Sequence, residues 1–252
     1  MTVTGDLLVF VSGLGGFDRI GIPGLSISYF RGLRDYLLRQ GITAHFPPQL
    51  PFASVADRAE YLARHLDGFR GQRILLIAHS MGGLDCRYLI HHLDPDRRVR
   101  GLATIATPHR GTPLADWFFD TDGLLQWLGR KLMTPALAEL RVNACERFNR
   151  VICDRPDVAY LSYAGVRPVE EIPLVFRPWS KLITAHAGAN DSQVPLTSAM
   201  WGQFKDQWRA DHFELAGWSL GIPNQSTSRP FDACSRYAKV LQDLLKATRQ
   251  AD

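Results

Sequence analysis

The sequence RILLIAHSMGGLDCRYLI, residues 73–90, contains a strand pattern and a helix pattern with very little chain between them. Residues 74–77 are all large and apolar, which is typical of a strand buried on both faces of a sheet. A helical pattern begins at Gly82. The A-H-S-M-G-G sequence at 78–83 is therefore either a plain strand-to-helix turn or a turn that exposes the hydroxyl of Ser80.

The composition is that of a globular protein that can bury a substantial core. The 252 residues are 46% hydrophobic and 21% charged, and no apolar run approaches the roughly 20 residues that span a bilayer. The formal net charge is only +4, and the basic residues are spread along the chain, so nucleic-acid binding is not expected. The four cysteines lack C-x-x-C or zinc spacing, which favours free buried thiols, with a Cys145–Cys153 disulfide as the alternative.

The N-terminal sequence MTVTGDLLVFVSG has no basic region and no cleavage pattern. Its apolar residues 7–11 are typical of a first strand rather than of a signal peptide. We therefore expect a cytoplasmic protein if the sequence is full length, and a secreted protein if a leader has been removed.

Apolar runs alternate along the chain with segments of helical periodicity. Ser54 and Asp57 form a capping box at the start of one such segment, where Val55, Ala59 and Leu62 share a face. The expected strands are 6–11, 42–46, 73–78, 99–106, 158–164 and 182–187, and the expected helices are 29–40, 54–66, 82–93 and 231–247.

This alternation predicts an α/β protein with a mainly parallel central sheet and helices on both faces. In such sheets the functional residues gather at the carboxyl ends of the strands. Residues 112–154 interrupt the alternation, because they contain many large apolar residues and no strand pattern. We expect this insertion to form a helical lid or cap over that edge within a single domain that spans residues 1–252.

A serine that acts as a nucleophile at a strand-to-helix turn needs small residues two positions before and after it, because larger side chains would collide there. Ala78 and Gly82 occupy these positions, so the pattern is A-x-S-x-G. A helix that begins near Gly82 also favours negative charge close to Ser80. The pattern therefore indicates a nucleophile, although similar turns occur in proteins without one.

A catalytic serine needs a base, and the base needs a group that orients it. Asp191 lies in a loop after the expected strand 182–187, and His212 lies further on, which gives the order serine, acid, histidine. The alternatives are a turn aspartate and a surface histidine. The other histidines fit less well: we expect His186 inside a strand, and we expect the side chain of His79 to point away from Ser80.

The negative oxygen that forms during acyl transfer needs backbone N–H donors. One expected donor is the amide of Met81, directly after Ser80. The other is the amide of Leu14, in the glycine-rich loop V-S-G-L-G-G-F at 11–17. The alternative of a phosphate-binding loop is weaker, since this sequence lacks the third glycine of a dinucleotide fingerprint and the Lys-Ser/Thr of a P-loop.

Seven ordered motifs resemble bacterial lipases of the α/β-hydrolase fold, close in layout to the true lipases of Pseudomonas and Burkholderia. The resemblance runs from about residue 7 to residue 218. The motifs are FVSGLGGFD at 10–18, YFRGLRDYLLRQG at 29–41, AHSMGGLDCRYLI at 78–90, ATPHRGTPLADW at 106–117, FNR at 148–150 with DVAYLSYAG at 157–165, GANDSQVP at 188–195 and ADHFELAGW at 210–218.

The resemblance implies that Ser80 is the nucleophile, His212 the general base and acid, and Asp191 its orienting carboxylate. Leu14 and Met81 would donate the oxyanion hydrogen bonds. The substrate-binding lid residues that it implies are Trp117, Phe118, Leu124, Leu125, Trp127 and Leu128. The alternative is that these side chains simply pack on the core.

Three features depart from the family pattern. Ser12 stands where relatives usually have histidine, so we expect it to hold the loop through a different hydrogen bond. The segment after Asp191 lacks the cysteine of the disulfide found in secreted relatives. Those relatives also bind calcium through an aspartate two residues after the histidine, where this chain has Glu214, so a calcium site is a minor alternative.

These features predict a serine hydrolase that cleaves carboxylic esters of apolar acyl or aromatic groups through an acyl-enzyme. The expected partner is a small-molecule or lipid ester, with transient contact between the lid and a lipid surface, and no cofactor or metal is expected. A thioesterase or an acyltransferase would use the same residues. The alternatives from other classes are a non-catalytic binding protein of the same fold and a membrane-surface binding module.

Overall fold

The computed structural model describes residues 5–16, 19–22, 25–220 and 231–250. Phe17 and Asp18, at the end of the first lipase-like motif, lie outside the described residues. The strands are β1 Asp6–Val11, β2 Arg19–Ile22, β3 Leu25–Ser28, β4 Arg73–His79, β5 Val99–Ile105, β6 Ala159–Gly165 and β7 Gln203–Trp208. The α-helices are α1 Leu33–Arg39, α2 Val55–Leu66, α3 Gly82–Tyr88, α4 Pro113–Asp120, α5 Leu124–Met133, α6 Ala136–Glu139, α7 Val142–Val151, α8 Arg177–Ala187, α9 Leu196–Ala199 and α10 Ala233–Gln250.

The central sheet contains five parallel strands in the order β1-β4-β5-β6-β7. Val11, Ala78 and Thr104 are paired across β1, β4 and β5, so these strands end together at one edge. The loops that follow the strands are thereby brought close to one another. The predicted parallel sheet is confirmed.

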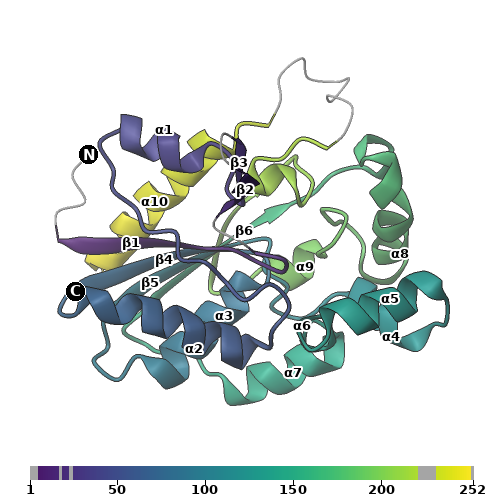
Figure 1. Cartoon of the computed structure of the whole chain (residues 1–252), viewed down its shortest axis with the longest axis horizontal. Helices are drawn as coiled ribbons and strands as arrows, with labels where there is room; N and C mark the ends of the chain where they lie inside the picture. Colours follow the sequence, from purple (N-terminus) through teal and green to yellow (C-terminus); the bar gives the residue numbers. More distant parts are fainter. Residues whose placement is uncertain (1–4, 17–18, 23–24, 221–230, 251–252) are drawn as a thin grey trace.

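Helices cover both faces of the sheet, as the alternation predicted (Figure 1). Phe10 and Ile77 pack on one face against α1 and α10, and Val11 and Leu76 pack on the other face against α2 and α3. Successive side chains of a strand point to opposite faces, so a strand between two layers of helices must be apolar at every position. This explains the uninterrupted apolar run of β4.

Helix α2 begins where the capping box predicted. The backbone N–H of Asp57 donates to the Ser54 hydroxyl oxygen at 3.1 Å, and the hydroxyl donates to the Asp57 carboxylate at 2.6 Å. The side chains of Val55, Ala59 and Leu62 are buried against the sheet and neighbouring helices.

Two of the predicted strands are wrong. Residues 182–187 belong to helix α8, because Trp179, Leu182 and Ile183 form an apolar face that packs against α4 and its neighbours. Residues 42–46 form no strand of their own: His45 makes a single bridge to Val9.

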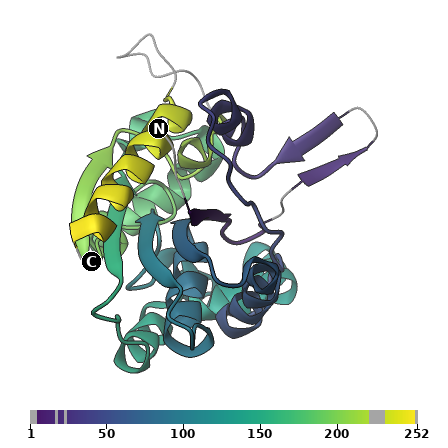
Figure 2. The same ribbon diagram turned by 90° about the vertical axis from the view of Figure 1, so that its left-hand side faces the viewer.

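Three strands, β2, β3 and β7, were not predicted. The sequence of β7, Q-F-K-D-Q-W, is polar because the strand lies at the edge of the sheet and only Trp208 in it is buried. The antiparallel pair β2–β3 forms a separate two-stranded sheet that projects from the body of the protein (Figure 2).

The insertion at 112–154 forms α4, α5, α6 and α7, which lie beyond the carboxyl edge of the sheet (Figure 1). Leu114, Phe118 and Leu137 in this insertion pack with Met81 and Leu84, next to Ser80. The insertion therefore covers the region where the strand-following loops meet. Among the described residues, no helix has both the length and the apolar composition to cross a bilayer.

Candidate active site

Ser80 lies at the sharp turn between β4 and α3 with its backbone in the left-handed region, at φ 56°. Its N–H donates to Ile105 O at 2.9 Å, and its carbonyl accepts from Gly83 N–H at 3.1 Å. A side chain at Gly82 would meet the carbonyl oxygens of Ser12 and Val11 at under 3 Å. The backbone at the end of β1 therefore lies too close to allow a side chain at this position, and glycine meets that requirement.

Thr107, which follows β5, supports the same turn and was not recognised in the sequence. Its hydroxyl donates to the Ser80 carbonyl oxygen at 2.7 Å. A side chain at Gly83 would lie only 2.2 Å from the Thr107 hydroxyl. The ATPHRG motif therefore contributes directly to the backbone conformation of Ser80.

The structure brings Ser80, His212 and Asp191 together in one hydrogen-bonded chain. His212 Nε2 lies 3.0 Å from Ser80 Oγ, and His212 Nδ1 lies 2.8 Å from Asp191 Oδ2. A carboxylate can only accept, so Nδ1 carries the proton and Nε2 is free to accept the serine proton. All three side chains are buried, with residue exposures of 6%, 5% and 1% for Ser80, His212 and Asp191.

Asp191 belongs to the acid loop, residues 188–195, which follows helix α8. Its second carboxylate oxygen accepts hydrogen bonds from the backbone N–H groups of Gln193 at 3.0 Å and Val194 at 2.7 Å. These bonds fix the carboxylate, and its Oδ2 faces the histidine. The backbone carbonyl of Asp191 also accepts a hydrogen bond from the backbone N–H of His212, at 2.8 Å.

His212 lies in the histidine loop, residues 209–217, which directly follows β7. Strand β7 lies between Asp191 and His212 in the sequence, so its place in the sheet determines where the histidine loop begins relative to the acid loop. Gly165, at the end of β6, lies between them: a side chain there would meet Ala210 O at 2.7 Å and Asp191 Cβ at 3.0 Å. The two loops thus pack closely around a glycine.

The glycine-rich loop after β1 closely approaches the turn at Ser80. A side chain at Gly13 would meet Ser80 Cβ at 2.6 Å, and the loop is tightened by a hydrogen bond from Gly16 N–H to Gly13 O at 3.0 Å. Leu14 lines the cavity that contains Ser80. Within the described part of the chain, the amides of Leu14 and Met81 donate to no protein acceptor.

Arg58 holds this loop, and its role was missed in the sequence. Its side chain is fully buried; Nε donates to Asp85 at 2.9 Å, and Nη2 donates to the carbonyls of Ser12 at 2.9 Å and Gly13 at 3.1 Å. Burial, partly offset by Arg58, raises the pKa of Asp85 to about 6. The sequence signal that could have identified Arg58 is its position on the apolar face of α2, three residues after Val55, where a charged side chain is unusual.

The prediction for the Ser12 side chain is wrong. Its hydroxyl is buried and, among the described residues, has no hydrogen-bond partner. The loop is held through the Ser12 backbone carbonyl, which accepts from Arg58.

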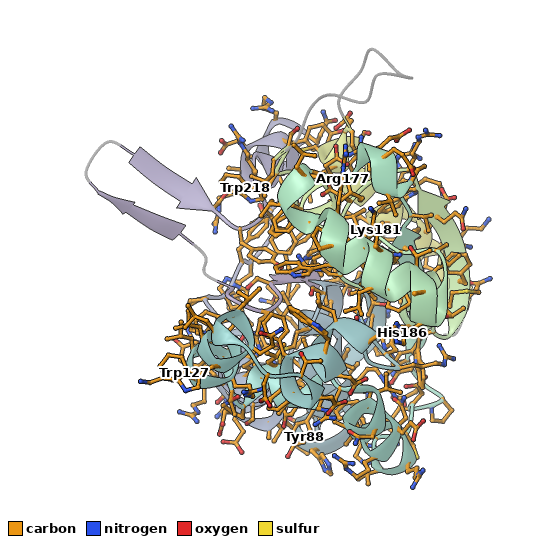
Figure 3. The ribbon with its side chains drawn as sticks, turned by 90° about the vertical axis from the view of Figure 1, so that its right-hand side faces the viewer. Tyr88, Trp127, Arg177, Lys181, His186 and Trp218 are labelled. Atoms are coloured by element: carbon orange, nitrogen blue, oxygen red, sulfur yellow. The ribbon has the colours of Figure 1, made fainter. Side chains whose placement is uncertain are left out.

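The prediction that His79 points away from the site is also wrong. Its ring centroid lies 4.7 Å from that of His212, its Nδ1 lies 2.7 Å from Tyr29 Oη, and it lines the cavity. Burial, reinforced by the neighbouring His212, holds the pKa of His79 well below its ordinary value. His79 is therefore neutral and places no positive charge beside His212. His186, expected in a strand, lies exposed on α8 (Figure 3).

A cavity of about 580 Å³ opens at Ser80 and His212. Most of its wall is apolar and comes from α4, the end of α5, α6, α8 and the loops after the strands. The lining side chains include Leu114, Ala115, Phe118, Met133, Leu137, Leu140, Trp179 and Val194. A cavity of this size and character suits an apolar ligand with its polar group at Ser80.

The predicted lid residues fall into two groups. Phe118 lines the cavity, and Trp117 is half-buried beside it with ring centroids 5.1 Å apart. The four on α5 are exposed instead of lining the cavity, and Figure 3 places Trp127 on the outer side of that helix. Their exposed fractions are 74% for Leu124, 51% for Leu125, 49% for Trp127 and 38% for Leu128.

The surroundings of Glu214 do not fit a calcium ion. Its carboxylate pairs with the guanidinium of Arg167, which also lies 3.5 Å from Asp211 Oδ2. Among the described residues, no three His, Cys, Asp or Glu side chains are grouped to hold a metal. A fixed cation thus already lies against these carboxylates. The four cysteines are free thiols, as expected, but only Cys86 and Cys145 are buried, whereas Cys153 is exposed.

Comparison with known proteins identifies relatives of this chain. Triacylglycerol lipase 2 of Saccharomyces cerevisiae is 30% identical over 244 residues, which cover 88% of this chain and 74% of the yeast protein. The chain belongs to the lipase family. The triacylglycerol lipase of Pseudomonas fragi is 31% identical over 113 residues, covering 43% of this chain and 36% of that protein. No protein-family model matches the chain.

Solved structures agree on the fold. A metagenomic carboxyl esterase superposes with a TM-score of 0.77 at 19% identity, covering 99% of this chain and 77% of the esterase. The α/β-hydrolase fold expected from the motifs is confirmed. The expected activity class is likewise confirmed: this lipase is a carboxylic ester hydrolase.

The Arg58–Asp85 pair gives a testable prediction. Arg58→Met leaves the Asp85 carboxylate buried without a partner, so the free energy of unfolding falls by about 3–5 kcal/mol. Arg58→Met combined with Asp85→Leu removes both charges and recovers most of this loss. Urea unfolding measures both values.

Ester hydrolysis stays impaired in both variants, because the carbonyls of Ser12 and Gly13 lose the donor that holds their loop. A double variant no more stable than Arg58→Met would contradict the prediction, as would a double variant with wild-type activity.

Proposed function

We propose that this lipase hydrolyses esters of apolar acyl groups through an acyl-enzyme on Ser80, with His212 as general base and acid and Asp191 as its orienting carboxylate. The observation that carries the proposal is the continuous chain from Ser80 Oγ to His212 Nε2 at 3.0 Å and from His212 Nδ1 to Asp191 Oδ2 at 2.8 Å. This is the geometry that general-base activation of a serine requires.

In the first step, Ser80 Oγ attacks the ester carbonyl and His212 Nε2 takes the hydroxyl proton. The charge on His212 is stabilised by Asp191, and the negative oxygen is stabilised by the amides of Leu14 and Met81. Each such donor contributes about 3–4 kcal/mol in comparable sites. His212 then protonates the leaving alcohol, the acyl group remains on Ser80, and water repeats the sequence to release the acid.

We assign the acyl group of the substrate to the cavity beside Ser80. Its lining by α4, α6 and α8 is apolar, and burial of each methylene there contributes up to about 0.8 kcal/mol. The yeast and Pseudomonas fragi relatives are both named triacylglycerol lipases, and this supports a lipid ester, such as an acylglycerol, as the substrate.

We also assign residues 112–154 to a lid within a single domain. Leu124, Leu125, Trp127 and Leu128 expose their apolar side chains on α5, next to the cavity-lining α4 and α6. Apolar side chains gathered on one helix favour contact with a lipid surface over water. The proposed role of α5 is transient contact with an aggregate that supplies the ester.

The nucleophile is tested by Ser80→Ala. Hydrolysis of p-nitrophenyl butyrate should fall to near background, by about 10⁴-fold or more, because no covalent intermediate can form. Circular dichroism and thermal unfolding establish that the variant is folded. A folded Ser80→Ala enzyme with a tenth of the wild-type rate would refute the assignment.

The acyl site is tested with p-nitrophenyl esters from acetate to palmitate. In the wild type, kcat/KM should rise by up to about fourfold per methylene until the cavity is filled, which is the rate equivalent of the burial energy of one methylene. Ala115→Leu narrows the cavity, so the rise should stop at a shorter chain while acetate hydrolysis changes little. An unchanged chain-length profile in this variant would place the acyl group elsewhere.

The role of α5 is tested by sedimentation with phosphatidylcholine vesicles. Leu124→Ser with Leu125→Ser should reduce the bound fraction several-fold, because it removes two exposed apolar side chains. Hydrolysis of the soluble butyrate ester should stay unchanged, since neither side chain lines the cavity. Equal vesicle binding by the two proteins would contradict the assignment.

A further inference from the structure

Arg167 lies between the acid loop and the histidine loop. It follows β6, and its side chain is only 5% exposed. Its backbone N–H donates to Asn190 O in the acid loop at 3.0 Å. Its guanidinium pairs with the Glu214 carboxylate in the histidine loop and lies 3.5 Å from Asp211 Oδ2. A single buried residue therefore contacts the position before Asp191 and both flanks of His212.

The carboxylates of Asp211 and Glu214 are shaped by the histidine loop itself. Asp211 Oδ1 accepts the backbone N–H groups of Phe213 at 2.9 Å and Glu214 at 3.0 Å, and Glu214 Oε2 accepts the N–H of Asp211 at 3.0 Å. Two buried carboxylates that contact the same guanidinium would repel each other without it, so a cation between them is needed. Burial, together with the charge of Glu214, raises the pKa of Asp211 to about 6.

Two further charged groups complete the cluster. Glu171 Oε2 lies 3.6 Å from Arg167 Nε, and the same carboxylate pairs with Arg209 at the surface. Arg209 is 51% exposed, whereas Arg167 is buried. Of these two arginines, Arg167 is the one that contacts both the acid loop and the histidine loop. Because its guanidinium already pairs with these carboxylates, they do not offer the several free oxygen ligands that a calcium ion needs.

We propose that Arg167 is a positioning residue whose guanidinium takes the place of a structural metal ion and holds the histidine loop against the acid loop. With both flanks of His212 fixed, the imidazole Nε2 is kept within reach of Ser80 Oγ. The inference rests on the proposed catalytic roles of Ser80, Asp191 and His212.

The experiment compares Arg167→Ala, Arg167→Lys and the matched control Arg209→Met, which removes an exposed arginine from the same cluster. In Arg167→Ala, kcat for p-nitrophenyl butyrate should fall by about 100-fold, as expected for a displaced catalytic group, with KM nearly unchanged. Arg167→Lys keeps a cation and should recover part of kcat. Arg209→Met should keep wild-type kcat.

Chemical rescue separates positioning from a general loss of stability. Guanidinium chloride, at concentrations far below those that unfold the wild type, should restore kcat in Arg167→Ala and leave Arg209→Met unchanged. Addition of EDTA or calcium chloride should change neither the kcat nor the melting temperature of the wild type.

The proposal is overturned if folded Arg167→Ala keeps wild-type kcat, if guanidinium restores none of the loss, or if EDTA lowers the kcat or melting temperature of the wild type. If Arg167→Ala does not fold, Arg167→Lys is compared with the neutral variant Arg167→Gln. Wild-type kcat and KM in Arg167→Lys support the proposal. A loss of kcat in Arg167→Lys that equals the loss in Arg167→Gln, and that guanidinium does not restore, overturns it. Failure of the proposed function is distinct, because Ser80→Ala would then retain hydrolysis.

Discussion

The left-handed backbone of Ser80 is the constraint on which the rest of the site depends. A residue with a side chain normally avoids this conformation, at a cost of about 1–2 kcal/mol. Here the strand pairing of β4, the hydrogen bond from Ser80 N–H to Ile105 O and the Thr107 hydroxyl bond to Ser80 O hold it in place. Gly82 and Gly83 leave room for the neighbouring chain. The side chain of Ser80 is thereby presented at the carboxyl edge of the sheet.

Two buried arginines organise the loops on either side of this serine. Arg58 fixes the glycine-rich loop through its backbone carbonyls and is balanced by Asp85. Arg167 contacts the acid loop and the histidine loop and is balanced by Asp211 and Glu214. In both places a guanidinium, with several donors in a rigid fork, joins segments that are distant in the sequence. Burying a charge costs free energy unless the charge is paired and hydrogen-bonded, and both guanidiniums meet this condition through their carboxylate partners.

The sequence was sufficient for features with strong local patterns. The apolar run of β4, the capping box at Ser54 and the small residues around Ser80 predicted their elements, and the ordered lipase-like motifs predicted the positions of Asp191 and His212. These features are determined by neighbours along the chain or by motifs shared with relatives.

Other features depend on contacts that no local pattern encodes. Residues 182–187, a short segment of mixed composition, predict a strand, whereas the helical spacing of Trp179, Leu182 and Ile183 shows only when α8 is considered as a whole. Edge strand β7 has no apolar run because most of it is exposed. The ring of His79 lies beside that of His212 and is hydrogen-bonded to the hydroxyl of Tyr29, fifty residues away in the sequence. Asp211 and Glu214, which pair with Arg167, are likewise more than forty residues further along the chain.

The central claim is that Ser80 carries the covalent intermediate. The most direct measurement is mass spectrometry of peptides from the wild-type protein after reaction with a fluorophosphonate, which forms a stable adduct with an activated serine. The account predicts one adduct per chain, on the Ser80 hydroxyl. An adduct on another residue, or no adduct in protein that hydrolyses esters, would contradict it.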